Sequence, residues 1–186
     1  MINTIIQSIY PLPEQSLAKL TETIDLVTLP KGHLLFKADK IATNIYFIKK
    51  GIARAFCHEV DNEVTFWFGM EGDIVLSYNS YISLKPGYEN IELLENSELF
   101  VLKSATLQAL YNEDIHIANW GRKFAEQELI KTEDRFISSQ SKNATTRYTE
   151  LINTTPDILK RVQLGYIASY LGITQVSLSR IRAVQK

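Results

Sequence analysis

The chain has 186 residues, of which 45% are hydrophobic and 22% charged, and its formal net charge is −1. This length allows one large domain or two small ones, and the composition is that of a globular protein. No apolar run approaches the ~20 residues of a membrane-spanning helix, and the N-terminus lacks a signal-peptide pattern. The single Cys57 excludes an internal disulfide and a zinc or iron–sulfur site built from cysteines alone. We therefore expect a cytoplasmic protein with no membrane partner.

The first hundred residues are predicted to form a β-structure. Segments rich in Ile, Val, Phe, Tyr and Trp alternate in polarity and are separated by turn residues such as Gly, Pro and Asn. Regular spacing of this kind favours a β-barrel, roll or sandwich, preceded here by a short helix over 13–21. The predicted strands are 24–29, 44–48, 52–58, 63–68, 90–94 and 98–102.

The hydrophobic period changes after Leu102 to that of helices. Residues 104–112 predict a short helix, and Asp114 to about Ser138 a long one whose apolar positions drift around its axis. This drift favours a helix buried on one side by its own domain and on another by a partner, so we expect a homodimer through 114–138. The alternative is an ordinary amphipathic helix packed on one domain. The Ser-rich run 138–143 is the expected hinge.

The segment from Gln163 to Arg182 has the pattern of a helix-turn-helix. A short amphipathic helix ends at Gly172, where a tight turn needs positive φ, and Thr174 stands at the expected N-cap of a second helix. Two short helices joined by a glycine turn can place the second helix in a major groove. The alternative is an ordinary terminal helix with a basic face.

Charge and periodicity both support the first interpretation. On a helical wheel the second helix has Leu178, Ile181 and Val184 on one face, and the opposite face carries no carboxylate. From Lys142 to the end there are seven Lys or Arg and two acids, a net charge of +5. The remainder has 13 Lys or Arg and 19 acids, a net charge of −6. A basic end on an acidic body is typical of a nucleic-acid-binding module.

The order of roll, long helix, hinge and helix-turn-helix resembles the Crp/Fnr family of transcription regulators, over nearly the whole chain. This resemblance implies an α+β fold: an N-terminal double-stranded β-helix (a jelly-roll-like β-roll), a long dimerisation helix and a small all-α C-terminal helix-turn-helix domain. The implied domains are a sensor over 1–112, a dimerisation helix over 113–138 and a DNA-binding domain over 139–186. The residues that carry the resemblance are Phe47–Gly51 with Ile52–Arg54, Gly69–Asp73, Ala144–Tyr148, and Ile167–Thr174 with Leu178–Ile181.

The resemblance also implies a function and partners. It implies a sequence-specific transcription regulator that binds double-stranded DNA as a homodimer and contacts RNA polymerase. The positions matching the family's base-reading residues are Gln175, Val176, Ser177 and Arg180, of which Ser177 points partly inward on the wheel. Phosphate contacts are expected from Thr174, Ser179, Arg182 and Lys186. Many relatives continue into a β-hairpin wing or a further helix, whereas this sequence stops at Lys186, so we expect the DNA contact to rest almost wholly on one helix.

The roll departs from the cyclic-nucleotide-binding members of the family. Those members have Gly-Glu for the ribose and Arg-Ser or Arg-Thr for the cyclic phosphate, whereas Leu76-Ser77 and Gly87-Tyr88 stand at these places here. A buried phosphate needs a guanidinium fork and N–H groups, yet Glu89 and Glu92 lie nearby. We therefore expect no usual binding of cyclic AMP or cyclic GMP, no cofactor, and either an unknown small-molecule effector or none. The candidates to line a pocket are Ser77, Tyr78, Tyr81, Gly87 and Tyr88.

No pattern indicates catalysis or a metal site. The neighbouring Cys57 and His58 would point to opposite faces of a strand, and the other histidines are isolated. Two other classes of protein stay open. One is a cyclic-nucleotide-binding-like module that regulates another protein without binding DNA, which a salt-dependent DNA-binding assay would distinguish. The other is a cupin-like β-barrel enzyme, which would need a metal cluster of His and carboxylate and which a metal assay would reveal.

Overall fold

The structure is a computed structural model that describes residues 1–60 and 62–184. Within these residues the chain forms two four-stranded sheets and a series of helices, one of them long, so the predicted α+β fold is confirmed. The chain divides into two compact units, Met1–Ala55 with Phe68–Glu128, and Phe56–Trp67 with Leu129–Lys186. No helix in the described part of the chain combines the length and hydrophobicity needed to cross a membrane.

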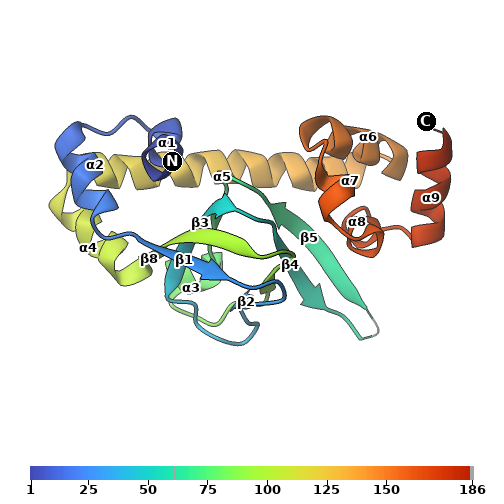
Figure 1. Cartoon of the computed structure of the whole chain (residues 1–186), viewed down its shortest axis with the longest axis horizontal. Helices are drawn as coiled ribbons and strands as arrows, with labels where there is room; N and C mark the ends of the chain where they lie inside the picture. Colours follow the sequence, from blue (N-terminus) through green and yellow to red (C-terminus); the bar gives the residue numbers. More distant parts are fainter. Residues whose placement is uncertain (61, 185–186) are drawn as a thin grey trace. The chain divides into compact units, whose positions relative to one another are not determined.

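The β-roll consists of two sheets of antiparallel strands (Figure 1). One sheet has the order β1-β8-β3-β6, made of Asp25–Leu29, Ser97–Lys103, Asn44–Lys50 and Ile74–Val75. The other has the order β2-β7-β4-β5, made of Leu34–Phe36, Asn90–Leu93, Ala53–His58 and Glu63–Gly69. The short strands β2 and β6 were not predicted, because two or three residues show no readable alternation.

The connection between β3 and β4 depends on Gly51. Its φ is +127°, and a Cβ at this position would lie 2.0 Å from the Ser97 Oγ. Only glycine combines this backbone conformation with so close an approach of β8. The Lys-Lys-Gly turn that the sequence indicates is therefore also a packing contact between distant strands.

Helices pack against the first sheet and close the core of the first unit. In Figure 1, α1 (Ile2–Ile9), α2 (Glu14–Thr21) and α4 (Ser104–Glu113) gather around the N-terminal half of α5 (Ile115–Ser141). The Trp120 indole N–H donates to the Ile6 carbonyl at 2.9 Å, which fixes α1 on α5. The sequence did not predict α1. The buried core residues here include Ile6, Leu20, Ile45, Phe47, Leu102, Leu107, Ile117 and Trp120.

The long helix ends later than predicted. Asp114 Oδ1 accepts hydrogen bonds from the His116 and Ile117 amides and so caps its start. The helix then continues to Ser141, three residues beyond the predicted end at Ser138. The Ser139 and Ser141 hydroxyls donate to carbonyls one turn earlier, of Phe136 and Ile137, so serines expected in a hinge are held within the helix. The break is confined to Lys142 and Asn143.

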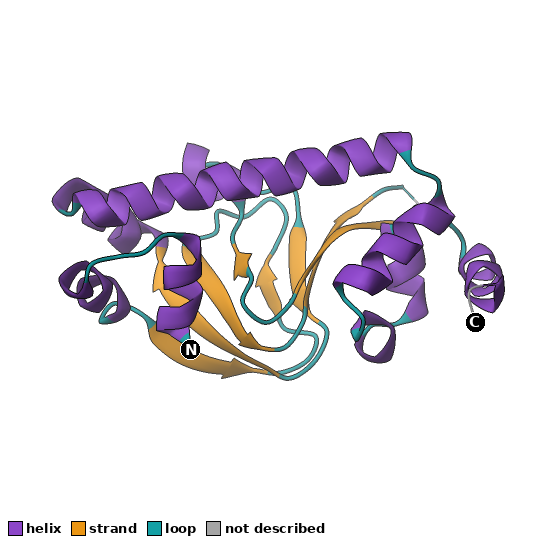
Figure 2. Ribbon diagram, turned by 90° about the horizontal axis from the view of Figure 1, so that it is seen from above, coloured by secondary structure: helices purple, strands orange, loops and turns teal. Residues whose placement is uncertain are grey.

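Four short helices follow α5 in the second unit. They are α6 (Ala144–Thr154), α7 (Ile158–Arg161), α8 (Leu164–Tyr170) and α9 (Gln175–Val184), and Figure 2 shows them grouped together and joined by short loops. Their shared core consists of Tyr148, Ile158, Val162, Ile167, Ala168, Leu171 and Leu178, each at most 5% exposed.

Candidate functional sites

A glycine turn joins α8 and α9, as the sequence predicts. Gly172 has a φ of +64°, its amide donates to the Ser169 carbonyl at 3.0 Å, and the Ile173 amide donates to the Ala168 carbonyl at 3.0 Å. These bonds satisfy the last carbonyls of α8 and turn the chain sharply into α9. The sharp turn between α8 and α9 therefore depends on one left-handed residue.

Thr174 caps α9. Its Oγ1 accepts a hydrogen bond from the Ser177 amide at 3.2 Å and lies 3.1 Å from the Ser177 Oγ. The two hydroxyls thus contact each other, and Ser177 is only partly exposed. Both residues stand at the start of the helix, where their first structural role is the cap.

The outer face of α9 is uncharged or basic. Gln175, Val176, Ser179 and Arg180 are exposed and Arg182 is partly exposed, whereas Leu178 is completely buried on the opposite side. No acidic residue occurs from Ile158 to Val184. The expected phosphate contact Lys186 lies outside the described residues.

Val184 does not share the buried face with Leu178. The helical wheel placed it there, but it is 87% exposed. The reason is geometric: Val184 is six residues after Leu178, so at about 100° per residue it lies about 120° around the helix from Leu178 and off the buried face. Ile181 is partly buried.

The side chain of Gln175 lies against the beginning of α8. A Cβ built on Gly165 would be 2.6 Å from the Gln175 Nε2, so the amide occupies the space that Gly165 leaves open. A base-reading role for Gln175 therefore requires its side chain to turn away from α8. The sequence showed no signal for this contact, because it joins residues ten positions apart across the turn.

Arg147 fixes α6 against the end of α8. Its Nη2 donates to the Leu171 carbonyl at 2.6 Å, one of the carbonyls that the end of α8 leaves open. Its Nε is buried and has no hydrogen-bond partner among the described residues. Sequence reasoning identified Arg147 only as part of a resemblance, and the structure places it in contact with the end of α8.

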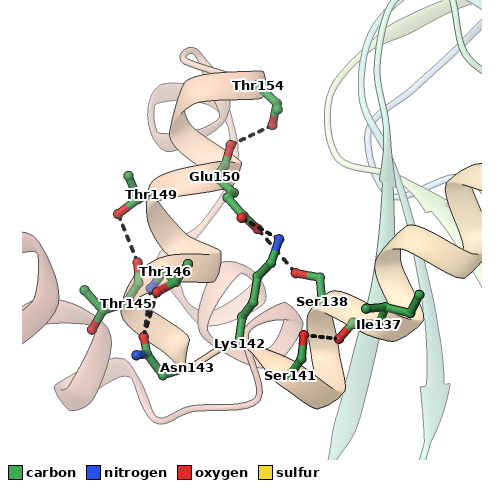
Figure 3. Close-up of polar contacts among 10 residues, drawn as sticks. All are labelled: Ile137, Ser138, Ser141, Lys142, Asn143, Thr145, Thr146, Thr149, Glu150 and Thr154. Carbon is green, nitrogen blue, oxygen red and sulfur yellow. Dashed lines mark hydrogen bonds and ion pairs between the residues drawn. The ribbon is translucent and has the colours of Figure 1, made fainter.

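The junction between α5 and α6 is held by polar contacts around Glu150 (Figure 3). The Lys142 Nζ lies 2.6 Å from one Glu150 carboxylate oxygen, and the Ser138 Oγ donates to the other at 3.3 Å. Asn143 caps α6 by accepting from the Thr146 amide at 2.9 Å. The hydrogen bond from Lys142 lowers the pKa of Glu150 below its usual value. The junction between α5 and α6 is therefore held by the contacts of Lys142 and Ser138 with Glu150.

An apolar stripe lies on the C-terminal part of α5. Leu129 is 71% exposed and Phe136 65%, and the neighbouring Ile130 and Ile137 are also more than half exposed. Each pair is seven residues apart, which places its members on one side of a helix. Large apolar side chains at this spacing form a stripe suited to packing against another helix.

Two of the predicted pocket tyrosines bind neighbouring helices. Both lie on α3 (Tyr78–Ser83), a helix the sequence did not predict. The Tyr81 hydroxyl donates to the Tyr111 hydroxyl of α4 at 3.0 Å, and burial raises the pKa of both phenols. The Tyr78 hydroxyl donates to the Glu128 carboxylate of α5 at 3.1 Å. Tyr88 is 68% exposed and lies at the surface.

Ser77 and Gly87 of the predicted pocket lie beside Glu89. A Cβ built on Gly87 would be 2.6 Å from the Ser77 Oγ and 3.1 Å from a Glu89 carboxylate oxygen. The arginine that binds the cyclic phosphate in the resembling family would therefore collide with Ser77 at its first side-chain carbon. The buried Arg54 is paired with Glu92 at 2.7 Å. The Glu89 carboxylate beside Gly87 carries a charge of the same sign as a phosphate.

The β-roll matches a known domain family. Residues 26–114 match the cyclic nucleotide-binding domain. No curated protein has a significantly similar sequence.

Several solved structures share the fold. FixK2 from Bradyrhizobium japonicum is 19% identical, with a TM-score of 0.71, over 86% of this chain and 83% of that chain. A transcriptional regulator assigned to the Crp/Fnr family from Eubacterium rectale is 14% identical, with a TM-score of 0.73, over 96% of this chain and 88% of that chain. The catabolite activator protein of Thermus thermophilus is 16% identical, with a TM-score of 0.59, over 95% and 84% of the two chains. At these identities the likeness concerns the fold.

Proposed function

We propose that this protein is a DNA-binding transcription regulator of the Crp/Fnr type, without enzymatic activity. The observation that carries the proposal is the outer face of α9. Arg180 and Arg182 have no hydrogen-bond or ion-pair partner within residues 1–60 and 62–184, and no acid accompanies them from Ile158 onward. A basic, carboxylate-free helix held by a glycine turn and a threonine cap is suited to a major groove.

Within this proposal the residues of α9 have different roles. Arg180 and Val176 project from the exposed face and read bases. Gln175 also reads a base once its side chain turns away from Gly165. Ser177 is the weakest base reader, because its hydroxyl contacts Thr174. Ser179, Arg182 and Lys186 contact phosphates, and the Thr174 hydroxyl does so only in addition to its cap.

The proposed active form is a homodimer that reads a pseudo-palindrome. Leu129, Ile130, Phe136 and Ile137 of α5 would pack against the same residues of a second copy, as in a two-helix coiled coil. A two-fold dimer places two copies of α9 on half-sites one helical turn apart. Contact with RNA polymerase belongs to the same proposal and is inferred from the fold relatives named as transcription regulators.

The input of the regulator is proposed not to be a cyclic nucleotide bound in the usual way. Glu89 stands near the place where a cyclic phosphate would lie, and Arg54 is already paired with Glu92. Bringing a cyclic phosphate monoanion beside a buried carboxylate is unfavourable without a compensating cation.

Unbiased selection of bound DNA from a random library tests the output. We expect enrichment of a palindromic sequence, and an affinity for it that falls steeply as salt is raised, because phosphate contacts release counterions. The control is an Arg180→Ala, Arg182→Ala double variant, which should bind more weakly and lose the preference at the base pair that Arg180 reads. Failure of the unaltered protein to enrich any sequence would instead favour a module that regulates another protein.

A further inference from the structure

Ser77 carries a buried hydroxyl that has no hydrogen-bond partner. The residue is 3% exposed, and its Oγ contacts no donor or acceptor among the described residues. It directly precedes α3, yet its side chain does not cap that helix. Buried hydroxyls are nearly always satisfied in folded proteins, so an exception indicates a missing partner.

Glu89 is a buried carboxylate with little compensation. It is 6% exposed, and one of its oxygens accepts from the Tyr88 amide at 3.0 Å. Within the described residues no Lys, Arg or His forms an ion pair with it. A buried carboxylate usually has a cation or several N–H donors around it, because desolvation of the charge is costly.

Gly87 brings these two groups to the same place. The position that a Cβ would take on Gly87 is 2.6 Å from the Ser77 Oγ and 3.1 Å from the Glu89 Oε1, so both oxygens flank one side of this residue. The backbone of Gly87 cannot satisfy either oxygen. Its amide donates to the Lys40 carbonyl at 3.1 Å, and its carbonyl accepts from the Asp39 amide at 2.9 Å.

The buried guanidinium of Arg54 is paired with a different glutamate. Arg54 is 2% exposed, and its Nε donates to Glu92 at 2.7 Å across the neighbouring strands β4 and β7. The roll therefore compensates the charge of Glu92 and leaves that of Glu89 without a cation. The Ser77 hydroxyl without a hydrogen-bond partner and the Glu89 carboxylate without a paired cation among the described residues define the chemistry of what would bind beside Gly87.

We propose that Ser77 and Glu89 bind a small organic cation that presents N–H donors, namely a guanidinium or primary ammonium group. A carboxylate and a hydroxyl match such a group in charge and in hydrogen bonding. The site would have the opposite charge preference from a cyclic-phosphate site. The proposal rests on the role of the roll as the input domain in the proposed function, and it holds or fails independently of DNA binding.

Amide chemical shifts of the full-length protein test this site directly. Agmatine and putrescine are the guanidinium and ammonium probes, and cyclic AMP is the anionic comparison. We expect at least one cationic probe to shift the Gly87, Tyr88 and Glu89 amides in a saturable manner, and cyclic AMP not to do so. Glu89→Gln should weaken this binding at least tenfold, which corresponds to about 1.4 kcal/mol. The control Glu59→Gln alters an exposed glutamate and should bind as the unaltered protein does.

A second measurement does not depend on the choice of probe. Glu89→Gln removes a charge that the unliganded fold does not compensate, so we expect the Tm to rise, whereas Glu59→Gln should leave it unchanged. Ser77→Ala supplies a smaller change that keeps the backbone and should also weaken the cationic probe. A lower Tm for Glu89→Gln, no saturable shift with either cation, or a preference for cyclic AMP would overturn the proposal. Each of these results can occur with DNA binding intact, so failure of the site is distinct from failure of the proposed function.

Discussion

The Ser169 hydroxyl of α8 accepts a hydrogen bond from the Thr65 amide of β5 at 2.9 Å and donates to the Glu63 carbonyl at 2.8 Å. Because β5 is the edge strand of its sheet, these two backbone groups have no further strand to pair with. One serine therefore satisfies both. The first residues of β5 belong to the same compact unit as α8 and α9, and this contact links them.

Ser169→Ala should loosen the hairpin tip from α8. Loss of two hydrogen bonds at a partly buried site is expected to cost about 1–3 kcal/mol. Amide hydrogen exchange at Thr65 should become faster, because its amide loses its acceptor. Ser139→Ala, at an exposed serine of α5 whose hydroxyl bonds only its own helix, should leave Thr65 exchange unchanged.

Arg180→Ala and Arg182→Ala should weaken DNA binding in different ways. Loss of a base contact by Arg180 is expected to cost about 1–3 kcal/mol and to relax preference at one base pair of the selected site. Loss of a phosphate contact by Arg182 should weaken all sequences alike and reduce the salt slope by about 1. Lys186→Ala should behave like Arg182→Ala. Fluorescence anisotropy on matched and mismatched duplexes measures both quantities, and equal losses on every duplex for both arginine variants would contradict the assignment.

Glu150 should titrate at lower pH than an isolated glutamate. Lys142 stabilises its charged form, so the pKa is lowered in the folded protein. The contribution of this carboxylate to the α5–α6 junction is therefore present above the pKa of the unfolded chain and is lost as the pH falls through the lower folded pKa. A carboxyl NMR titration measures this pKa. Lys142→Gln should raise the midpoint toward the usual value, whereas Lys160→Gln, which removes the partner of Asp157, should not move it.

Leu129→Glu with Phe136→Glu should convert the proposed dimer to a monomer. Two carboxylates in the apolar stripe would face the same residues of the second copy, where burial of like charges is unfavourable. Sedimentation equilibrium should show the mass of one chain instead of two. Leu26→Glu introduces a charge at another exposed apolar residue, on β1, and should stay dimeric. A monomeric unaltered protein would contradict the proposed seam.

Gly172→Ala should destabilise the second unit. A φ of +64° is unfavourable for a residue with a Cβ, although the nearest atom to that Cβ, the Arg147 Nη2, is 3.9 Å away. The cost is therefore one of backbone conformation, about 1 kcal/mol or more. Thermal unfolding would show it, and Gly32→Ala, at another positive-φ glycine with open space around it, should have a similar cost in the first unit.

Some features of the fold could be read from short stretches of sequence. The turn at Gly172, the cap at Thr174 and the longer strands depend on residues close together in the chain, where backbone conformation and local hydrogen bonds dominate. The helical period correctly predicted that Arg180 and Val176 lie on the exposed outer face of α9. The prediction was wrong at Val184, which lies about 120° around the helix from the buried Leu178 and is exposed.

The serine-rich composition predicted the end of α5 too early. A run of serines is typical of a hinge, but the Ser139 and Ser141 hydroxyls bond carbonyls of their own helix and remain within it. The helix α3 and the strands β2 and β6 are too short to produce a periodic signal. They take their form from the surrounding roll.

The amino-acid order alone was sufficient for the succession of longer strands and helices, the glycine turn and the basic face of the last helix, because each depends on local propensity, period or charge. Three relationships needed the folded chain: the Ser169 contact with a strand 104 residues away, the Lys142–Glu150–Ser138 junction, and the meeting of Ser77 with Glu89 beside Gly87. Each joins side chains whose distance depends on how separate elements pack. No periodicity encodes such distances. The proximity of Ser77 to Glu89 and the contact of Ser169 with β5 could therefore be found only in the folded structure.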